Sequence, residues 1–458
     1  MLNLISQKIS GKFVLPLVEG GKGVSISNGE TCGAWAANDA VGTFSAVNAD
    51  SYDEAGNVIP QIYHGKTREE RRRELIEYAV NGGIAQAKIA RERSNGRGRI
   101  HMNALWEMGG SQEIITRILE GAKDCIHGVV CGAGMPYELS EIAAKFKVFY
   151  YPIVSSDRAF SALFRRSFKK CVEFLGGVVY EDPWLAGGHN GLSNAESPTN
   201  PMNPYLRLVN LRKVMNSFNL KYLPIIIAGS VWWLSEWADY INNDELGNVA
   251  FQFGTRPILT TECPVAKAWQ PKFMALKRGD VKLTRLSPTG FYSSAINNEM
   301  LADLIARQER QAPIVEQSDL KVSVFGNEVC LDESFREKVS FWTAQGFSAA
   351  MLTPDKTVVF VTPEQSVSIL QSQRNCCCCL SACRFSSWCQ TKGSTGRIPD
   401  PRSFCIQRSL QEVAHGGNLD ENLLFAGHSA YRFAEDPFYA NNYIPTTKEL
   451  IERIQTGY

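Results

Sequence analysis

Short runs of apolar and β-branched residues alternate with helical patterns through the first 255 residues of the chain. Most of these runs are continuously apolar, as expected of parallel strands that are covered on both faces. We identify eight of them, at residues 13–18, 41–46, 99–105, 128–131, 148–154, 177–180, 224–228 and 249–253. Between them lie amphipathic segments, including one with Ile76, Val80 and Ile84 on one face and others at 114–122 and 159–175.

This alternation predicts an α/β protein built on a closed (β/α)₈ barrel, because eight strand–helix units in about 250 residues is the size of that fold. An open, doubly wound sheet is the alternative. Two loops are long and rich in Gly, Pro and polar residues, at 50–67 and 182–204. Long loops in a compact enzyme are often functional.

The pattern changes near residue 313. Residues 321–324 and 357–361 are typical of strands, and 363–373 and 447–455 are typical of helices. A cysteine-rich segment at 376–405 lies between them. We therefore expect two parts, a barrel at 1–312 and a C-terminal α+β appendage at 313–458.

The charge and hydropathy of the chain limit the kinds of molecule that we expect it to bind. Among 458 residues, 48 Lys+Arg balance 47 Asp+Glu, so the net charge of +1 argues against nucleic acid or an anionic membrane as the main partner. The first ten residues do not resemble a secretory signal, and no apolar run has the length of a membrane helix. We expect a soluble, cytoplasmic protein with a small-molecule substrate; the sequence carries no signal for its oligomeric state.

Candidate chemistry gathers just after the predicted strands, where the active site of a (β/α)₈ barrel forms. Glycines recur at five of the eight strand ends, which lets the backbone approach a flat ligand closely. The segments concerned are Glu19-Gly20-Gly21-Lys22-Gly23, Asn103, Gly132-Ala133-Gly134, Glu181, Ala186-Gly187-Gly188-His189-Asn190-Gly191, Ala228-Gly229-Ser230 and Gln252-Phe253-Gly254-Thr255-Arg256.

Two of these segments suggest a phosphate site, and a third suggests an acid/base. Barrels of this kind often hold a phosphate on the loops after strands seven and eight. Gly229-Ser230 and Gly254-Thr255 supply small residues and hydroxyls there. His189 lies between glycines in a long loop, where we expect an accessible imidazole with a pKa near ~6.5, suited to proton transfer.

Together these motifs resemble the nitronate monooxygenase (2-nitropropane dioxygenase) family of FMN-dependent barrel enzymes, which includes FMN-dependent enoyl-acyl carrier protein reductases. The resemblance covers residues 10–265 and rests on the glycine segments after strands one, four, six, seven and eight. Its most specific part is the combination of two elements, Gly187-Gly188-His189-Asn190-Gly191 and Gln252-Phe253-Gly254-Thr255-Arg256.

The resemblance implies a role for each matching residue. His189 matches the catalytic base, and FMN would be bound by Gly20, Gly21, Gly23, Asn103, Glu181, Gly187, Gly188, Gly229, Ser230, Gln252, Gly254 and Thr255. Three positions depart from the family pattern. Lys22 replaces an apolar residue, Ser230 replaces a glycine, and Glu181 replaces a common glutamine.

Seven of the thirteen cysteines lie between Cys376 and Cys405. Cys376, Cys379 and Cys383 have ligand-like spacing, and Cys405 or Cys389 is a possible fourth thiolate. The segment therefore predicts an iron–sulfur cluster beside FMN or, alternatively, a zinc site or unligated thiols.

Three functions follow as hypotheses. The leading one is oxidation of an alkyl nitronate or its parent nitroalkane with dioxygen, with His189 as catalytic base. The second is NAD(P)H-dependent reduction of an enoyl thioester. The third is a non-catalytic flavin and iron–sulfur electron-transfer module.

Overall fold

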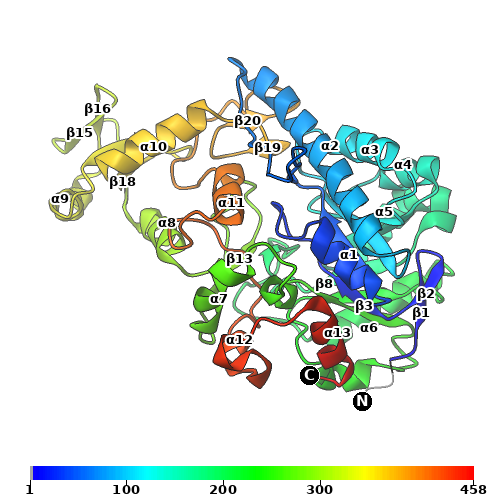
Figure 1. The fold of residues 1–458 in the computed structure, drawn as a ribbon. Helices are drawn as coiled ribbons and strands as arrows, with labels where there is room; N and C mark the ends of the chain where they lie inside the picture. Colours follow the sequence, from blue (N-terminus) through cyan, green and yellow to red (C-terminus); the bar gives the residue numbers. More distant parts are fainter. Residues whose placement is uncertain (1–3) are drawn as a thin grey trace.

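The computed structural model describes residues 4–458, and its centre is a closed, eight-stranded parallel barrel (Figure 1). The strands follow one another around it, and the last pairs with the first through Phe253 and Glu19. They are β3 (Leu17–Glu19), β4 (Val41–Ser45), β5 (Arg99–Leu105), β6 (Gly128–Gly132), β7 (Phe149–Val154), β8 (Val178–Glu181), β10 (Ile225–Ala228) and β11 (Val249–Phe253). Each predicted run supplies one strand, so the (β/α)₈ barrel is confirmed and the open sheet is wrong.

The first run is shorter than predicted. Pro16 interrupts it, because proline lacks the N–H that a central strand donates. Residues before it form the hairpin of β1 (Gln7–Ile9) and β2 (Lys12–Val14). Ile9 and Val14 pack with inward-facing barrel residues, so the hairpin closes the N-terminal end of the barrel.

Six α-helices, α1 to α6, pack around the barrel, and their local sequences explain their limits. In α2 (Arg68–Arg93), Thr67 and Glu70 form a capping box at the start. The predicted helix at 159–175 is divided into α5 and a 3₁₀ helix, η1 (Phe168–Phe174). The α-helices are α1 (Gly29–Ala37), α2, α3 (Ser111–Gly121), α4 (Leu139–Phe146), α5 (Asp157–Arg166) and α6 (Pro204–Ser217).

A second layer covers the C-terminal end of the barrel. The long loop after β8 contains a short strand, β9 (Gly188–His189), which pairs with the hairpin of β12 (Val281–Thr284) and β13 (Ser293–Ile296). Next to it lie η3 (Arg256–Leu259), α7 (Ala266–Met274) and α8 (Glu299–Glu309). The loop that carries His189 is thus part of a small antiparallel sheet.

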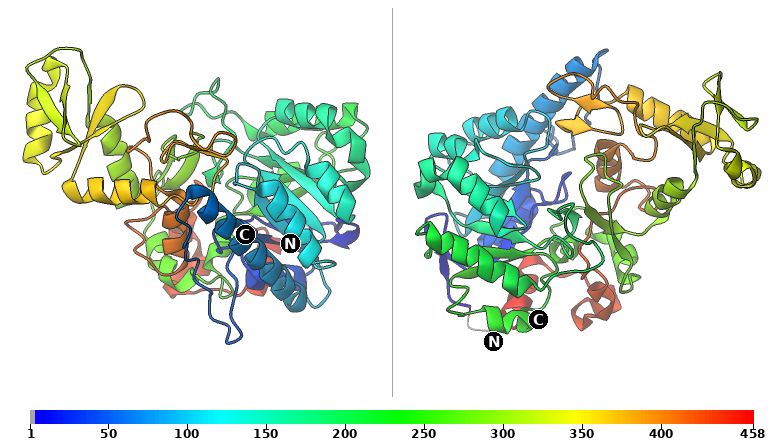
Figure 2. Two further views of the ribbon diagram at one scale, coloured as in Figure 1. Left: turned by 90° about the horizontal axis from the view of Figure 1, so that it is seen from above. Right: turned by 180° about the vertical axis from the view of Figure 1, so that it is seen from behind.

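Residues 311–374 form a lobe that projects away from the barrel, at the upper left of Figure 1 and at the edge of both views in Figure 2. The predicted strands at 321–324 and 357–361 and the helix near 363–373 are present. The lobe contains β14 (Gln311–Pro313), β15 (Lys321–Val324), β16 (Asn327–Cys330), α9 (Arg336–Ala344), β17 (Ala349–Leu352), β18 (Thr357–Val361) and α10 (Pro363–Arg374).

The chain then returns to the barrel. It forms the hairpin of β19 (Ala382–Cys383) and β20 (Trp388–Cys389), followed by α11 (Ile406–Ala414), α12 (Arg432–Glu435) and η5 (Pro437–Asn442). The last helix, α13 (Thr447–Gln455), matches its predicted range and packs against α1 through Leu450, Ile451 and Ile454. The division at residue 312 stays a prediction; in space the segments before and after it interleave.

A buried ion pair fixes the returning chain to the barrel. Arg256, at the end of the motif after β11, lies 3.4 Å (Nη2) from Asp436 Oδ2, and both side chains are 0% exposed. The indole N–H groups of Trp232 and Trp233 donate to the same oxygen, each at 3.1 Å. Arg256 also donates to the Trp232 carbonyl at 2.7 Å. The arginine of the motif is therefore a structural residue.

Within residues 4–458, no helix combines the length and the apolar character that crossing a membrane requires.

Candidate active site

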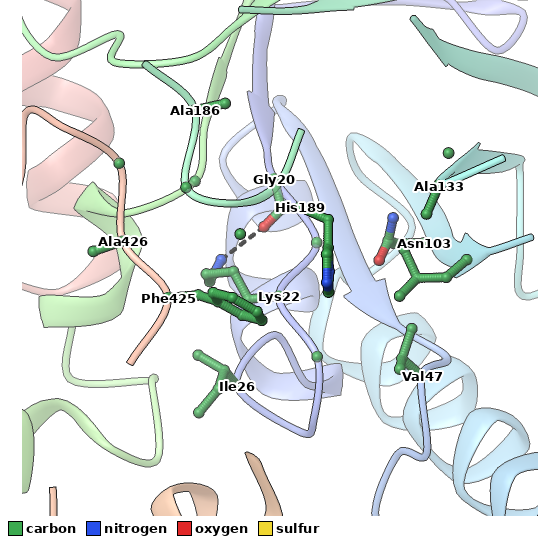
Figure 3. A pocket seen from close by; sticks show the side chains of 18 of the residues that line it. Gly20, Lys22, Ile26, Val47, Asn103, Ala133, Ala186, His189, Phe425 and Ala426 are labelled. Atoms are coloured by element: carbon green, nitrogen blue, oxygen red, sulfur yellow. Dashed lines mark hydrogen bonds between the residues drawn. The ribbon is translucent and has the colours of Figure 1, made fainter. Parts of the chain in front are cut away.

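A cavity of about 240 Å³ opens at the C-terminal end of the barrel. Figure 3 shows His189, Asn103, Lys22 and Phe425 arranged around this space. The structure brings all the predicted catalytic and FMN-binding residues to its wall: His189, Gly20, Gly21, Gly23, Asn103, Glu181, Gly187, Gly188, Gly229, Ser230, Gln252, Gly254 and Thr255. Their location at one cavity is shown, and their individual roles stay predictions.

The glycines at the wall are there for two different reasons. A Cβ on Gly21 would lie 2.3 Å from Asn103 Cβ, and one on Gly187 would lie 2.5 Å from the Ala426 carbonyl carbon. These two positions are small because the protein itself packs against them. A Cβ on Gly254 would meet no protein atom within 4 Å. Gly254 therefore leaves room in the cavity for something other than the chain.

The loops after β10 and β11 form the polar end of the cavity. Gly229 and Ser230 both have positive φ, 105° and 56°, so Ser230 keeps the left-handed backbone that glycine adopts readily. The Ser230 hydroxyl donates to the Leu185 carbonyl at 3.0 Å, which uses its proton. Thr255 Oγ1 accepts from the Gly427 amide at 2.9 Å and keeps its own proton. Of the two hydroxyls, only that of Thr255 is free to donate to an anion.

His189 is not in a free loop, as we expected from the sequence. It lies in β9, opposite Ser293 of β13. Its Nε2 is 2.5 Å from Ser287 Oγ, and the Phe425 ring packs edge-on with centroids 5.4 Å apart. Burial lowers the pKa of His189 to about 4, because the charged imidazolium loses its hydration. The imidazole is therefore neutral at neutral pH.

Two carboxyl groups lie at or next to the cavity in contrasting settings. Glu19 is fully buried; burial raises its pKa, while the nearby Lys22 ammonium, 3.2 Å away, opposes the shift. Lys22 also donates to the Gly20 carbonyl at 2.8 Å, shown dashed in Figure 3. Glu181 lacks such a cation, and burial together with the charge of Asp182 raises its pKa to about 8. Glu181 is then protonated at neutral pH and can donate a hydrogen bond.

The C-terminal part of the chain contributes an apolar wall that sequence reasoning did not find. Its side chains come from the segment before β19, from α11 and from the segment that follows α11. They are Leu380, Ile406, Leu410, Val413, Leu423 and Phe425. These residues lie more than 100 positions from the barrel strands, and apolar residues on a short helix carry no signal that distinguishes a cavity wall from ordinary core.

The predicted four-cysteine ligand set stays a prediction. Among residues 4–458, no three His, Cys, Asp or Glu side chains come together closely enough to hold a metal ion. The Cys376 thiol is 3.2 Å from Ser386 Oγ and accepts from the Cys378 amide. Cys379 lies at the cavity wall, and burial raises the pKa of Cys383 and of Cys405, the latter to about 12. All four thiols pack in or against an apolar cluster that includes Phe385 and Trp388.

Comparison with solved structures confirms the fold. FabK from Thermotoga maritima matches with a TM-score of 0.51 at 14% identity, over 99% of this chain and 93% of that one. The enoyl reductase domain of MlnA, from the macrolactin biosynthesis cluster of Bacillus amyloliquefaciens, matches with a TM-score of 0.55 at 11% identity, over 97% and 93%. Nitroalkane oxidase from Streptomyces ansochromogenes matches with a TM-score of 0.49 at 13% identity, over 97% of this chain and 95% of that one. No protein-family model and no curated protein matches the sequence.

Proposed function

We propose that the chain is an FMN-dependent oxidoreductase that uses His189 as its acid/base. The observation that carries this proposal is the glycine-lined cavity at the barrel mouth, where Gly254 leaves space that no protein atom fills. The donors at the wall also fit a flavin, since Asn103, Gln252 and protonated Glu181 can each donate to a ring nitrogen or carbonyl. FabK and the MlnA enoyl reductase domain share the fold.

The residues present would hold the cofactor at its two ends. The ribityl phosphate suits the Thr255 hydroxyl and the backbone N–H groups of the turns at Gly229-Ser230 and Gly254, since such turns bind anions. The ring would lie among Gly20, Gly21 and Asn103. When bound, the flavin supplies the electron acceptor or hydride donor. The chain's own part is to orient the substrate, exclude water and move a proton.

The first candidate substrate is a small carbon acid, such as a nitroalkane and its nitronate. The supporting observation is that His189 is neutral, because a base must be uncharged to accept the α-proton. The second candidate is an enoyl thioester reduced at the expense of NAD(P)H. It is favoured by the apolar wall, because that surface can bind a carbon chain longer than that of a simple nitroalkane.

Anaerobic mixing of the purified, flavin-loaded protein with each reactant tests the proposal. Loss of the oxidised flavin absorbance on addition of NADPH alone supports the reductase. The same loss with a nitronate alone supports oxidation of nitronates. A protein that retains no FMN after reconstitution contradicts the proposal as a whole.

Replacing Gly254 with aspartate is expected to abolish FMN retention while the barrel stays folded. The new carboxylate would lie beside the phosphate, and like charges about 4 Å apart repel by roughly 1–4 kcal/mol. Gly254→Ser, which adds atoms without charge, is the matched control. Bound flavin after gel filtration and the circular dichroism spectrum give the two readouts; equal FMN content in both variants would contradict a phosphate at this turn.

A further inference from the structure

Two hydroxyl groups extend the hydrogen bonding of His189 along the cavity wall. Ser287 Oγ lies 2.5 Å from His189 Nε2, and Ser287 is only 1% exposed. The same oxygen is 3.0 Å from Thr289 Oγ1. Thr289 is half-buried and lines the cavity. The three groups therefore form a continuous chain of hydrogen bonds from the half-buried His189 ring, through the buried Ser287 hydroxyl, to the half-buried Thr289 hydroxyl.

The local fold holds this chain in place. Pairing of His189 with Ser293 fixes β9 against β13, so that the β12–β13 loop folds over the imidazole. In that loop the Thr289 amide donates to Ser287 Oγ at 3.4 Å, and the Phe291 amide donates to Thr289 Oγ1 at 3.2 Å. Each hydroxyl oxygen thus accepts from a backbone N–H, which leaves its own proton free to point along the chain.

We propose that Ser287 and Thr289 are a proton relay that joins His189 Nε2 to water at the cavity, and that Ser287 is the residue that positions the ring. The proposal rests on the proposed function of His189 as acid/base. Among the described residues Nδ1 has no hydrogen-bond partner. With Nε2–H donated to Ser287, Nδ1 is the nitrogen with the free lone pair.

During abstraction each proton moves one position along the chain of hydrogen bonds. Nδ1 takes the substrate proton as Nε2 gives its proton to Ser287 Oγ. Ser287 passes its own proton to Thr289 Oγ1, and Thr289 passes its own to water. His189 stays neutral as the Nδ1–H tautomer. After the product leaves, Nδ1 loses its proton to water and the relay returns one to Nε2.

The surroundings of His189 explain why such a path matters. The ionisable side chains at the cavity wall nearest in kind to a counter-charge are those of Lys22, Glu107 and the protonated Glu181, and none of them hydrogen-bonds the imidazole. Lys22 is bound to Glu19, and Glu107 accepts from the Ser381 hydroxyl. A buried imidazolium without a counter-charge is costly, so export of the charge along a hydroxyl chain lowers that cost.

Nitrogen-15 NMR of histidine-labelled, flavin-loaded protein tests the relay without turnover, with His189→Asn used to assign the signal. We expect the wild type to hold the Nε2–H tautomer. Ser287→Ala should produce a mixture of tautomers, and Ser287→Thr should restore the single one. Thr289→Val should leave the tautomer unchanged. It should slow exchange of the Nε2 proton with water about tenfold, which is less than the 10²–10⁴-fold rate contribution of a residue that acts directly as acid/base. Ser294→Ala, on β13 but bonded to His428, is the control that changes neither.

Kinetics with a nitroalkane or an enoyl thioester give the second arm. Thr289→Val should lower the turnover rate. In the wild type the plot of turnover rate against the deuterium content of the solvent should be curved, as is typical when several protons move together; in the variant it should be linear. The relay would be overturned if Ser287→Ala left the tautomer of His189 unchanged, or if Thr289→Val left the exchange rate of the Nε2 proton unchanged. Absence of wild-type turnover on either substrate, with the NMR effects present, would instead count against the proposed function and leave the relay standing.

Discussion

Replacing His189 with asparagine is expected to slow turnover of a neutral nitroalkane by about 10²–10⁴-fold, the contribution typical of a positioned acid/base. Asparagine keeps a similar volume and some hydrogen bonding to Ser287 but has no basic nitrogen. The variant should retain much more activity on a preformed nitronate, whose proton is already gone. Because the pKa of His189 is lowered to about 4, the wild-type rate of proton abstraction should fall only as the pH drops through that value.

FMN content provides the internal check, since the phosphate turns lie on other strands and should be unaffected. His428→Asn is the matched control, because His428 is also half-buried and bonded to a serine, Ser294, but does not line the cavity. Equal losses of activity on the nitroalkane and on the nitronate would mean that His189 binds the anion rather than abstracting a proton. No loss on either, with flavin retained, would make it a structural histidine.

Replacing Asp436 with alanine is expected to lower the free energy of unfolding by about 3–5 kcal/mol. The change leaves the Arg256 guanidinium buried without its counter-charge and removes the acceptor of two indole N–H groups. Urea denaturation followed by tryptophan fluorescence measures the effect, and two of the nine tryptophans report directly on the network.

Asp420→Ala is the control for this prediction. Asp420 pairs with Lys272 at a partly exposed position, with side chains 41% and 26% exposed, so its loss should cost only about 0–1 kcal/mol. Similar urea midpoints for Asp436→Ala and Asp420→Ala would mean that the buried network does not stabilise the packing of the C-terminal segment against the barrel.

The barrel could be predicted because its signals are local. A parallel strand covered on both faces is a continuous apolar run wherever it occurs, and β5 and β11 begin and end where the pattern predicts. Strand ends of a closed barrel must meet at one mouth, so the candidate glycines, Asn103 and Gln252 could be placed together from topology alone. Pro16 shows the limit of pattern, since one residue removed half of a predicted strand.

The surroundings of His189 could not be predicted, because they depend on which distant segments pack there. Ser287 and Phe425 lie 98 and 236 positions further along the chain, and neither belongs to a motif. Their contacts change the expected chemistry from an accessible imidazole of ordinary pKa to a half-buried, desolvated one that is neutral at neutral pH.

The cavity wall begins at Gly20 and ends at Ser429, and this span has a consequence for how the protein is made. Synthesis proceeds from the N-terminus, and domains generally fold in that order. Every barrel strand leaves the ribosome before the segment that carries Phe425 and Gly427. The site is therefore complete only after the segment that carries Phe425 has been made. A chain ending before α11 would have the glycine turns and His189 but would lack one wall of the cavity.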